Sequence, residues 1–183
     1  MRIVFLFFIL SALTNLHAQI YMAKTGEISF FSKASLEDID ARNSNARPAM
    51  DTKSGKITVR ASMRAFKFKS GFMEEHFNEN YVESEKYPHA IFEGKIRDNE
   101  KIDYTKEGEY NVVCDGKMTL HGQTKDISAP GKITIKGNKI FIDSKFKLTL
   151  ADYKIEIPAQ RLANIAETVD VTVKAEMEPF KKQ

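Results

Sequence analysis

The stretch YNVVCDGKMTLHGQTKDISAPGKITIK, residues 110–136, decides the fold. Over residues 110–120, the even-numbered positions other than Gly116 are apolar and most odd-numbered ones are polar; the apolar residues are Tyr110, Val112, Cys114, Met118 and Leu120. After residues 121–123 the phase inverts, and the apolar residues become Ile127, Ala129, Ile133 and Ile135. Because successive side chains of a strand point to opposite faces, the pattern predicts two strands that share one buried face. The short connection with its glycine is typical of a hairpin turn.

The same alternation recurs on both sides of this hairpin and predicts strands at 21–32, 55–65, 92–96, 140–157 and 169–177. A phase slip after Ala65 predicts a β-bulge, and Gly137-Asn138 predicts a two-residue turn. Residues 35–48 are polar and weakly patterned, which predicts a loop leading into a poorly buried strand; residues 99–109 are predicted to form a charged loop. Seven or eight strands with a single helix indicate an all-β barrel or sandwich.

One segment, residues 70–84, carries a helical pattern. Its apolar and aromatic residues fall on one side, and its glutamates lie mostly on the other. Pro88 forbids continuation of the helix, so the sheet is expected to resume there.

The N-terminus has the order of a secretory signal: Met1-Arg2 is followed by the apolar residues 3–13 and by the small residue Ala18. This order predicts a cleaved signal peptide at 1–18, a single domain at 19–183 and a periplasmic or secreted location. No cysteine follows the cleavage point, so a lipoprotein is not expected, and no later stretch is apolar enough for a stable membrane span.

Charge and cysteine usage exclude further classes of protein. The formal net charge is +3, with lysines and glutamates interspersed along the strands, so we expect no nucleic acid partner. The single cysteine, Cys114, cannot form an intramolecular disulfide. It lies on the apolar face of its strand, which favours a buried, inert thiol over a reactive or dimerising one. The possibility of a homodimer is not decided by the sequence.

The interior of the predicted sheet contains small inward residues: Ala61, Gly94, Gly116, Ala129, Gly131 and Ala175. A barrel of eight strands has an interior that side chains fill or that holds one ligand. The small residues favour a cavity, whereas Phe92, Tyr110 and Phe146 could fill the same space, so both interiors remain open at this point.

Three segments together resemble the YceI-like family: HFNENYVESEKYPHAIFEGKI (76–96), GKMTLHGQTKDISAPG (116–131) and KFKLTLADYKIEIP (145–158). The resemblance implies an all-β fold, an extended eight-stranded antiparallel lipocalin-like β-barrel with one helix covering the mouth. It also implies a lumen that holds a long apolar chain such as a polyisoprenoid. The sequence departs from the family at residues 33–36, where a His and Gly pair is usual, and at Lys154, which replaces a corner glycine.

The resulting hypothesis is a binding protein, without catalysis, for a long-chain apolar amphiphile: a polyisoprenoid, an isoprenoid quinone or another lipid. No cofactor is expected apart from such a bound isoprenoid-type lipid. The side chains expected near the mouth are Phe66, Phe68, Phe72, Phe77, Tyr81 and Phe92. Those expected to line the tunnel are Met63, Tyr110, Met118, Ile133, Phe146, Leu148 and Val171.

No catalytic or metal-binding pattern stands out. His76 has no second histidine at the spacing of a zinc site, and His121 is expected to face solvent in the hairpin turn. Arg60, Arg64 and the lysines at 67 and 69 are expected to form a solvated cationic face, with contact to a charged headgroup as the alternative reading.

Two other functions stay open at this point. One is an envelope stress or adhesion protein with a solid core that acts through its outer surface. The other is an isomerase or redox accessory, which would need an inward titratable group; Tyr110 and Cys114 are the inward candidates.

Overall fold

The predicted hairpin is formed by β7 (Gly108–Leu120) and β8 (Gln123–Lys136) in a computed structural model that describes residues 20–180. The register pairs Tyr110 with Ile133 and Cys114 with Ala129, as the shared buried face requires. The two turn residues, His121 and Gly122, have φ values of 49° and 69°, the left-handed conformation that matches the twist of a tight hairpin. The predicted signal peptide lies outside the described residues.

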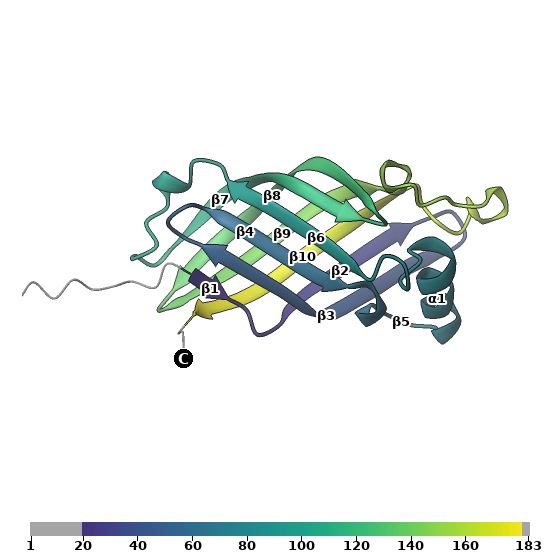
Figure 1. Ribbon diagram of the computed structural model, residues 1–183, viewed down its shortest axis with the longest axis horizontal. Helices are drawn as coiled ribbons and strands as arrows, with labels where there is room; N and C mark the ends of the chain where they lie inside the picture. Colours follow the sequence, from purple (N-terminus) through teal and green to yellow (C-terminus); the bar gives the residue numbers. More distant parts are fainter. Residues whose placement is uncertain (1–19, 181–183) are drawn as a thin grey trace, which may run out of the picture.

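Eight long strands close into an antiparallel barrel, which confirms the predicted fold class (Figure 1). Besides β7 and β8 they are β2 (Gly26–Lys33), β3 (Asp38–Asp51), β4 (Lys56–Ser62), β6 (His89–Ile96), β9 (Lys139–Thr149) and β10 (Thr168–Pro179). Each pairs with the next around the barrel, and β10 closes it by pairing with both β9 and β2. Two short strands flank this barrel: β1 (Ile20–Met22) pairs with β10 and β3, and β5 (Lys67–Phe68) pairs with β3.

The predicted helix lies between β4 and β6, at one end of the barrel (Figure 1). It consists of α1 (Gly71–His76) and a wider π-helical turn at Phe77–Tyr81, in which Val82 N donates to Phe77 O at 3.0 Å. We call residues 71–82 the lid and this end of the barrel the mouth. The lid ends well before Pro88, as the sequence predicted.

The connection between β6 and β7 seals the opposite end. It begins with a 3₁₀ turn at Asn99–Lys101, and the side chain of Asn99, only 8% exposed, donates to Thr52 O at 2.8 Å. The hydroxyl of Tyr104 donates to Asn99 Oδ1 at 2.7 Å. Ile102 and Tyr104 pack against the core at this end, whose buried residues include Tyr21, Met50, Ile135, Ile140 and Met177. The prediction of a charged loop at 99–109 was therefore incomplete, because side chains of this connection pack into the end of the barrel. We call residues 99–104 the plug.

Strand β3 is the clearest correction to the sequence reading: residues 35–48 were expected to be a loop leading into a poorly buried strand, whereas the strand begins at Asp38 and is well buried on one face. Its buried positions are occupied by Ala41, Asn43, Ala46, Pro48 and Met50, so small and polar residues hide the alternation. Asn43 is fully buried and donates to Ser62 O at 2.9 Å, beyond the point where the β3–β4 pairing ends.

Three smaller corrections concern strand ends. The predicted bulge after Ala65 is a 3₁₀ turn, Met63–Ala65, and residues 21–32 form two strands. The strand expected to run to residue 157 stops at Thr149, where a 3₁₀ turn, Leu150–Tyr153, begins. Lys154 follows with a φ of 55°, so a lysine adopts the left-handed conformation at the corner where the family carries glycine.

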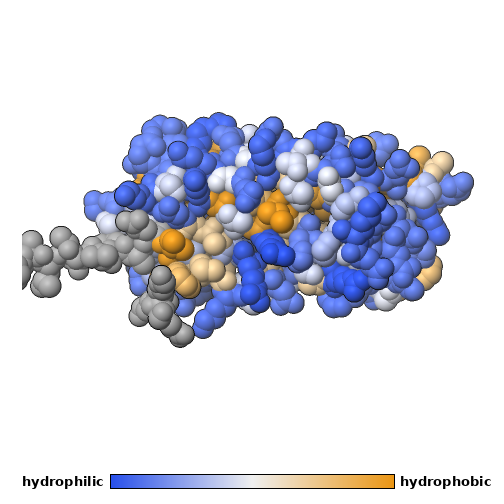
Figure 2. Space-filling model, viewed as in Figure 1, coloured by the Kyte–Doolittle hydropathy of each residue, from blue (hydrophilic) through white to orange (hydrophobic). Residues whose placement is uncertain are grey.

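The outer wall is mostly hydrophilic in the view of Figure 2. Among residues 20–180, no helix is long and apolar enough to cross a membrane.

Candidate ligand cavity

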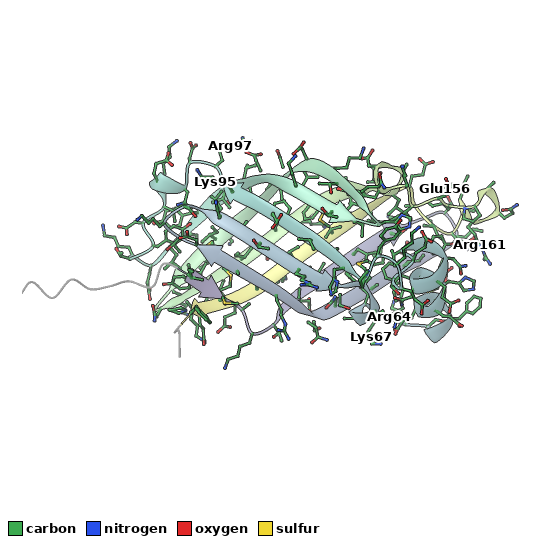
Figure 3. The ribbon with its side chains drawn as sticks, viewed as in Figure 1. Arg64, Lys67, Lys95, Arg97, Glu156 and Arg161 are labelled. Carbon is green, nitrogen blue, oxygen red and sulfur yellow. The ribbon has the colours of Figure 1, made fainter. Side chains whose placement is uncertain are left out.

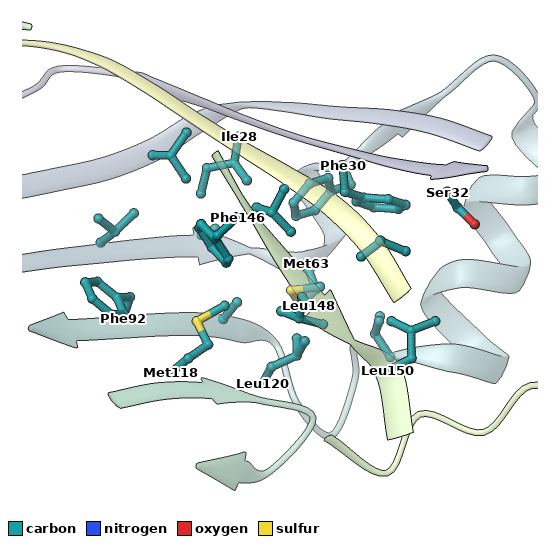
Figure 4. A pocket seen from close by; sticks show the side chains of 18 of the residues that line it. Ile28, Phe30, Ser32, Met63, Phe92, Met118, Leu120, Phe146, Leu148 and Leu150 are labelled. Atoms are coloured by element: carbon teal, nitrogen blue, oxygen red, sulfur yellow. The ribbon is translucent and has the colours of Figure 1, made fainter. Parts of the chain in front are cut away.

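A cavity of about 480 Å³ lies inside the barrel beneath the lid. All eight barrel strands contribute side chains to it, and its inner end reaches Ile57, Ile96 and Cys114, which belong to the sealed-end core. Aliphatic and aromatic side chains form most of the wall, and Figure 4 shows several of them pointing into the same space. The polar lining residues at the mouth include Ser32, Glu37, Ser70, His76, Arg161 and Asn164.

Glycine and alanine positions keep this space open, but in different ways. Ala61, Ala129 and Gly131 line the cavity directly, as the sequence predicted. Gly94 acts through its neighbour: an added Cβ there would lie 2.6 Å from the ring of Phe92, so the ring lies along the wall over the glycine. Gly116 is required by the close approach of the β6 backbone. Ala175 packs in the sealed-end core and contributes nothing to the width of the cavity.

Four phenylalanines join the lid to the barrel. Phe77 of the lid stacks on Phe30 of β2 at a centroid distance of 5.7 Å and tilts against Phe68 of β5 at 5.0 Å. Phe66 contacts both Phe30 and Phe77, at 5.6 and 5.8 Å. These are favourable distances for aromatic pairs, so the lid is anchored by the same rings that form the outer part of the cavity wall.

His121 fastens the base of the lid to the barrel rim, contrary to the prediction that it faces solvent. Its side chain is only 11% exposed, and Nε2 lies 2.6 Å from Glu83 Oε2 while Nδ1 lies 3.0 Å from Tyr153 O. The ring of Tyr87 meets the imidazole edge to face at 4.8 Å. Both ring nitrogens thus lie within hydrogen-bonding distance of an oxygen atom from another segment. We call His121 with its partners Glu83 and Tyr153 the latch. It joins the segment after the lid, the β7–β8 turn and the β9–β10 connection.

Surface ion pairs flank the lid. Lys67 pairs with Glu74, and Arg64 pairs with Glu85 at 3.0 Å, while Arg60 contacts His89. The cations are largely exposed, and exposed pairs of this kind contribute little to stability. The arrangement fits the expected solvated cationic face, since none of these cations lines the cavity.

All but one of the residues predicted to bind the ligand line the cavity. Those that do are Met63, Phe66, Phe68, Phe72, Phe77, Tyr81, Phe92, Met118, Ile133, Phe146, Leu148 and Val171. Tyr110 does not: it packs against the sealed-end core, with its hydroxyl 3.5 Å from Asp103 O. Phe92 lies deeper than the expected mouth position, against the same core. Whether the lining residues bind a ligand stays a prediction.

The structure adds lining residues that sequence reasoning missed. They include Ile28, Phe30, Ile39, Val112, Ile142 and Ile165. Ile28, Phe30, Val112 and Ile142 lie on recognised alternating strands, so the signal was present. Ile39 lies at the start of β3, where the sequence predicted a loop, and Ile165 lies in an irregular connection.

Cys114 lines the cavity with 8% of its surface exposed. Burial, together with the neighbouring Asp115 carboxylate, raises the pKa of its thiol to about 12. The thiol is thus neutral and a poor nucleophile near neutral pH. Among the described residues no cluster of histidine, cysteine or acidic side chains could hold a metal ion.

A closed antiparallel barrel with an apolar cavity under a short helical lid defines a lipocalin-like binding fold. The chain belongs to the YceI-like family, because the family's YceI-like domain model matches residues 13–177. No curated protein matches the chain.

Solved structures agree on the fold. A polyisoprenoid binding domain from Saccharophagus degradans, implicated in plant cell wall breakdown, is 16% identical with a TM-score of 0.77, over 89% of this chain and 99% of that one. BcnA from Burkholderia cenocepacia is 14% identical with a TM-score of 0.69, over 82% and 95%. A Campylobacter jejuni YCEI protein is 20% identical with a TM-score of 0.58, over 75% and 81%.

Proposed function

We propose that this chain holds one long-chain apolar amphiphile in its barrel lumen and does no chemistry on it. The ligand class is a polyisoprenoid, an isoprenoid quinone or another lipid with a comparable chain. The observation that carries the proposal is the cavity itself, whose volume of about 480 Å³ lies in the range of small-molecule sites and whose wall is mostly apolar. The polyisoprenoid binding of the Saccharophagus relative supports the same ligand class.

The energetics of such a site need little polar recognition. Each methylene transferred from water into the apolar lumen contributes about 0.8 kcal/mol, so a long chain can be held tightly by burial alone. The polar lining residues at the mouth would meet a headgroup, with Arg161 and Glu37 offering charges of opposite sign. An absence of catalysis is consistent with the inert Cys114 thiol and with Tyr110 lying off the cavity.

The location is part of the proposal. Residues 1–18 would direct export, and the single domain 19–183 would act in the periplasm or outside the cell. The alternative of an envelope stress or adhesion protein with a solid core is less well supported, because it needs side chains to fill the space where the cavity lies.

Blocking the lumen tests the proposal. Ala129 lines the cavity, so Ala129→Phe should abolish uptake of a fluorescent polyprenyl or quinone probe by the purified protein. Ser128→Phe places the same ring at the adjacent, exposed position on the outer face of β8 and should bind like the wild type. Wild-type protein that takes up neither probe, or equal uptake by both variants, would overturn the proposal.

A further inference from the structure

The mouth of the barrel carries three strongly exposed large apolar side chains. Leu36 is 75% exposed, Phe72 is 64% exposed and Leu162 is 49% exposed. They come from three different segments: the β2–β3 connection, α1 and the β9–β10 connection. Figure 1 shows these three segments together at one end of the molecule, opposite β1 and the C-terminal end of β10. Ile20, Met22 and Phe180 are also exposed, at the opposite end, but none of them lines the cavity. The three at the mouth lie around its opening, and apolar side chains gathered at such a place need an explanation.

A backbone hydrogen bond and the lining of the cavity place the segments of these three residues at the same rim. Leu36 N donates to Ala163 O at 2.9 Å, so the loops that carry Leu36 and Leu162 touch each other. Phe72 lines the cavity entrance together with Arg161 and Asn164, which lie on the Leu162 loop. Phe72 thus reaches both solvent and cavity. We call Leu36, Phe72 and Leu162 the rim patch.

We propose that the rim patch inserts into the surface of a lipid bilayer, and that the cavity is loaded and emptied while the protein is docked there. The inference rests on the proposed function, because the source of a long-chain amphiphile is a bilayer. A chain that crossed water to reach the lumen would expose each of its methylenes. From a docked mouth, the chain instead passes Phe72 and enters the aromatic wall formed by Phe30 and Phe77.

The charges around the rim patch indicate what kind of bilayer contact this is. Both signs occur close together, and Figure 3 shows Glu156 and Arg161 at this end of the barrel. The charged residues of the two connections are Glu37, Asp152, Lys154, Glu156, Arg161 and Glu167. A polybasic surface would favour anionic lipids, whereas these two connections carry both signs without an excess of basic residues. Docking therefore depends on apolar insertion and should differ little between zwitterionic and anionic bilayers.

A second copy of the chain fits the rim patch less well. A stable protein interface takes about 800 Å² from each partner, and three side chains supply only a fraction of that area. Shallow insertion into a bilayer, in contrast, needs only a few apolar side chains beside an opening.

Vesicle flotation tests the docking, with vesicles of pure phosphatidylcholine and of phosphatidylcholine mixed with phosphatidylglycerol. The test variant is the double substitution Leu36→Ser with Leu162→Ser, since both residues are exposed and neither lines the cavity. We expect it to lose about tenfold or more in vesicle binding, to a similar degree on both compositions. The matched control is Phe180→Ser, which removes a ring that is 50% exposed at the opposite end and should bind like the wild type.

Two routes of probe delivery separate docking from lumen binding. A fluorescent polyprenol added from dilute ethanol should fill the wild type and the double variant equally, whereas transfer from vesicles should be slower for the double variant. If the wild type takes up the probe from neither source, the proposed function fails. If it takes up the probe from ethanol but does not bind vesicles, or if the double variant and the Phe180→Ser control bind alike, the docking proposal is overturned. A wild-type dimer that the double variant converts to a monomer would assign the rim patch to self-association and overturn it as well.

Discussion

At the scale of single residues, buried polar atoms decide where the fold gains or loses stability. Two buried side-chain atoms within residues 20–180 have no hydrogen-bond partner, Asn78 Oδ1 and the hydroxyl of Tyr153. Tyr153 is 2% exposed, and burial raises the pKa of its hydroxyl. Tyr104, at the other end of the barrel, is satisfied by its hydrogen bond to Asn99.

The two tyrosines should therefore respond in opposite ways to loss of the hydroxyl. Tyr153→Phe removes an unsatisfied group and should leave the free energy of unfolding unchanged or raise it by about 1 kcal/mol. Tyr104→Phe leaves the buried Asn99 Oδ1 without its donor and should lower the free energy of unfolding by roughly 1–2 kcal/mol. Urea unfolding of the two variants measures this difference, and a larger loss for Tyr153→Phe would show that its hydroxyl has a partner in solution.

The buried Cys114 thiol should make the free energy of unfolding fall as the pH rises through the alkaline range. Its pKa is about 12 in the fold against an ordinary value of 9.0, so the folded state keeps the proton through a window in which the unfolded chain has lost it. The contribution is complete below about pH 9 and is lost as the pH rises towards 12, with a slope of about 1.4 kcal/mol per pH unit. Urea unfolding across this window should show that slope as the difference between the wild type and Cys114→Ala. Parallel pH curves would contradict the assignment.

Residue roles that depend on distant partners could not be predicted from the sequence. His121 was expected in solvent because its turn is polar, yet its acceptors Glu83 and Tyr153 lie 38 and 32 residues away. Tyr110 fits the inward pattern of β7, but its position near the sealed end places it beside the plug. The alternation along a strand predicts on which face of the sheet a side chain lies, but it does not predict how far along the barrel axis that side chain lies.

At the scale of elements, the lid is the part of the fold that lies over the cavity at the mouth. It is held from within by the phenylalanine cluster and from its base by the His121 latch. The cluster is apolar and would also contact a ligand, whereas the latch lies outside the cavity lining. A substitution in the latch therefore changes how firmly the lid is held and leaves the residues that line the cavity unchanged.

Removing the latch should loosen the lid selectively. His121→Ala deletes both hydrogen bonds at Glu83 and Tyr153, and amide hydrogen exchange over residues 71–82 should become about tenfold faster. His89→Ala is the matched control, because His89 contacts Arg60 on the surface and has no role in the latch. Lid exchange that is the same in both variants would show that the phenylalanine cluster holds the lid alone.

Elements with clean periodicity were predicted, and those without it were not. The β7–β8 hairpin and the lid follow directly from period-two and helical patterns over 110–136 and 70–84. The length and burial of strand β3 were underestimated because Ala41, Asn43 and Ala46 occupy its buried face, and Asn43 is buried through a hydrogen bond that no hydrophobic pattern signals. The plug was missed because charged residues surround the few side chains that pack inward.

At the scale of the whole molecule, the barrel divides into a sealed half and a hollow half. In the sealed half, side chains such as Met50, Ile140 and Met177 pack together with Ile102 and Tyr104. In the hollow half, aliphatic side chains and the phenylalanine rings line the cavity, whose inner end reaches the sealed half. The sequence alone could not decide between a solid interior and a cavity, because the choice depends on where the Phe92 ring lies and on how the β6–β7 connection folds. An occupied cavity also predicts that ligand binding stabilises the fold by mass action.

Native mass spectrometry of the purified protein, followed by lipid extraction, tests the central claim most directly. The account predicts that the chain carries one copy of an extractable long-chain lipid and that the Ala129→Phe variant, with its lumen blocked, carries none. Wild-type protein that is empty as isolated and that takes up no polyprenyl or quinone probe would contradict it.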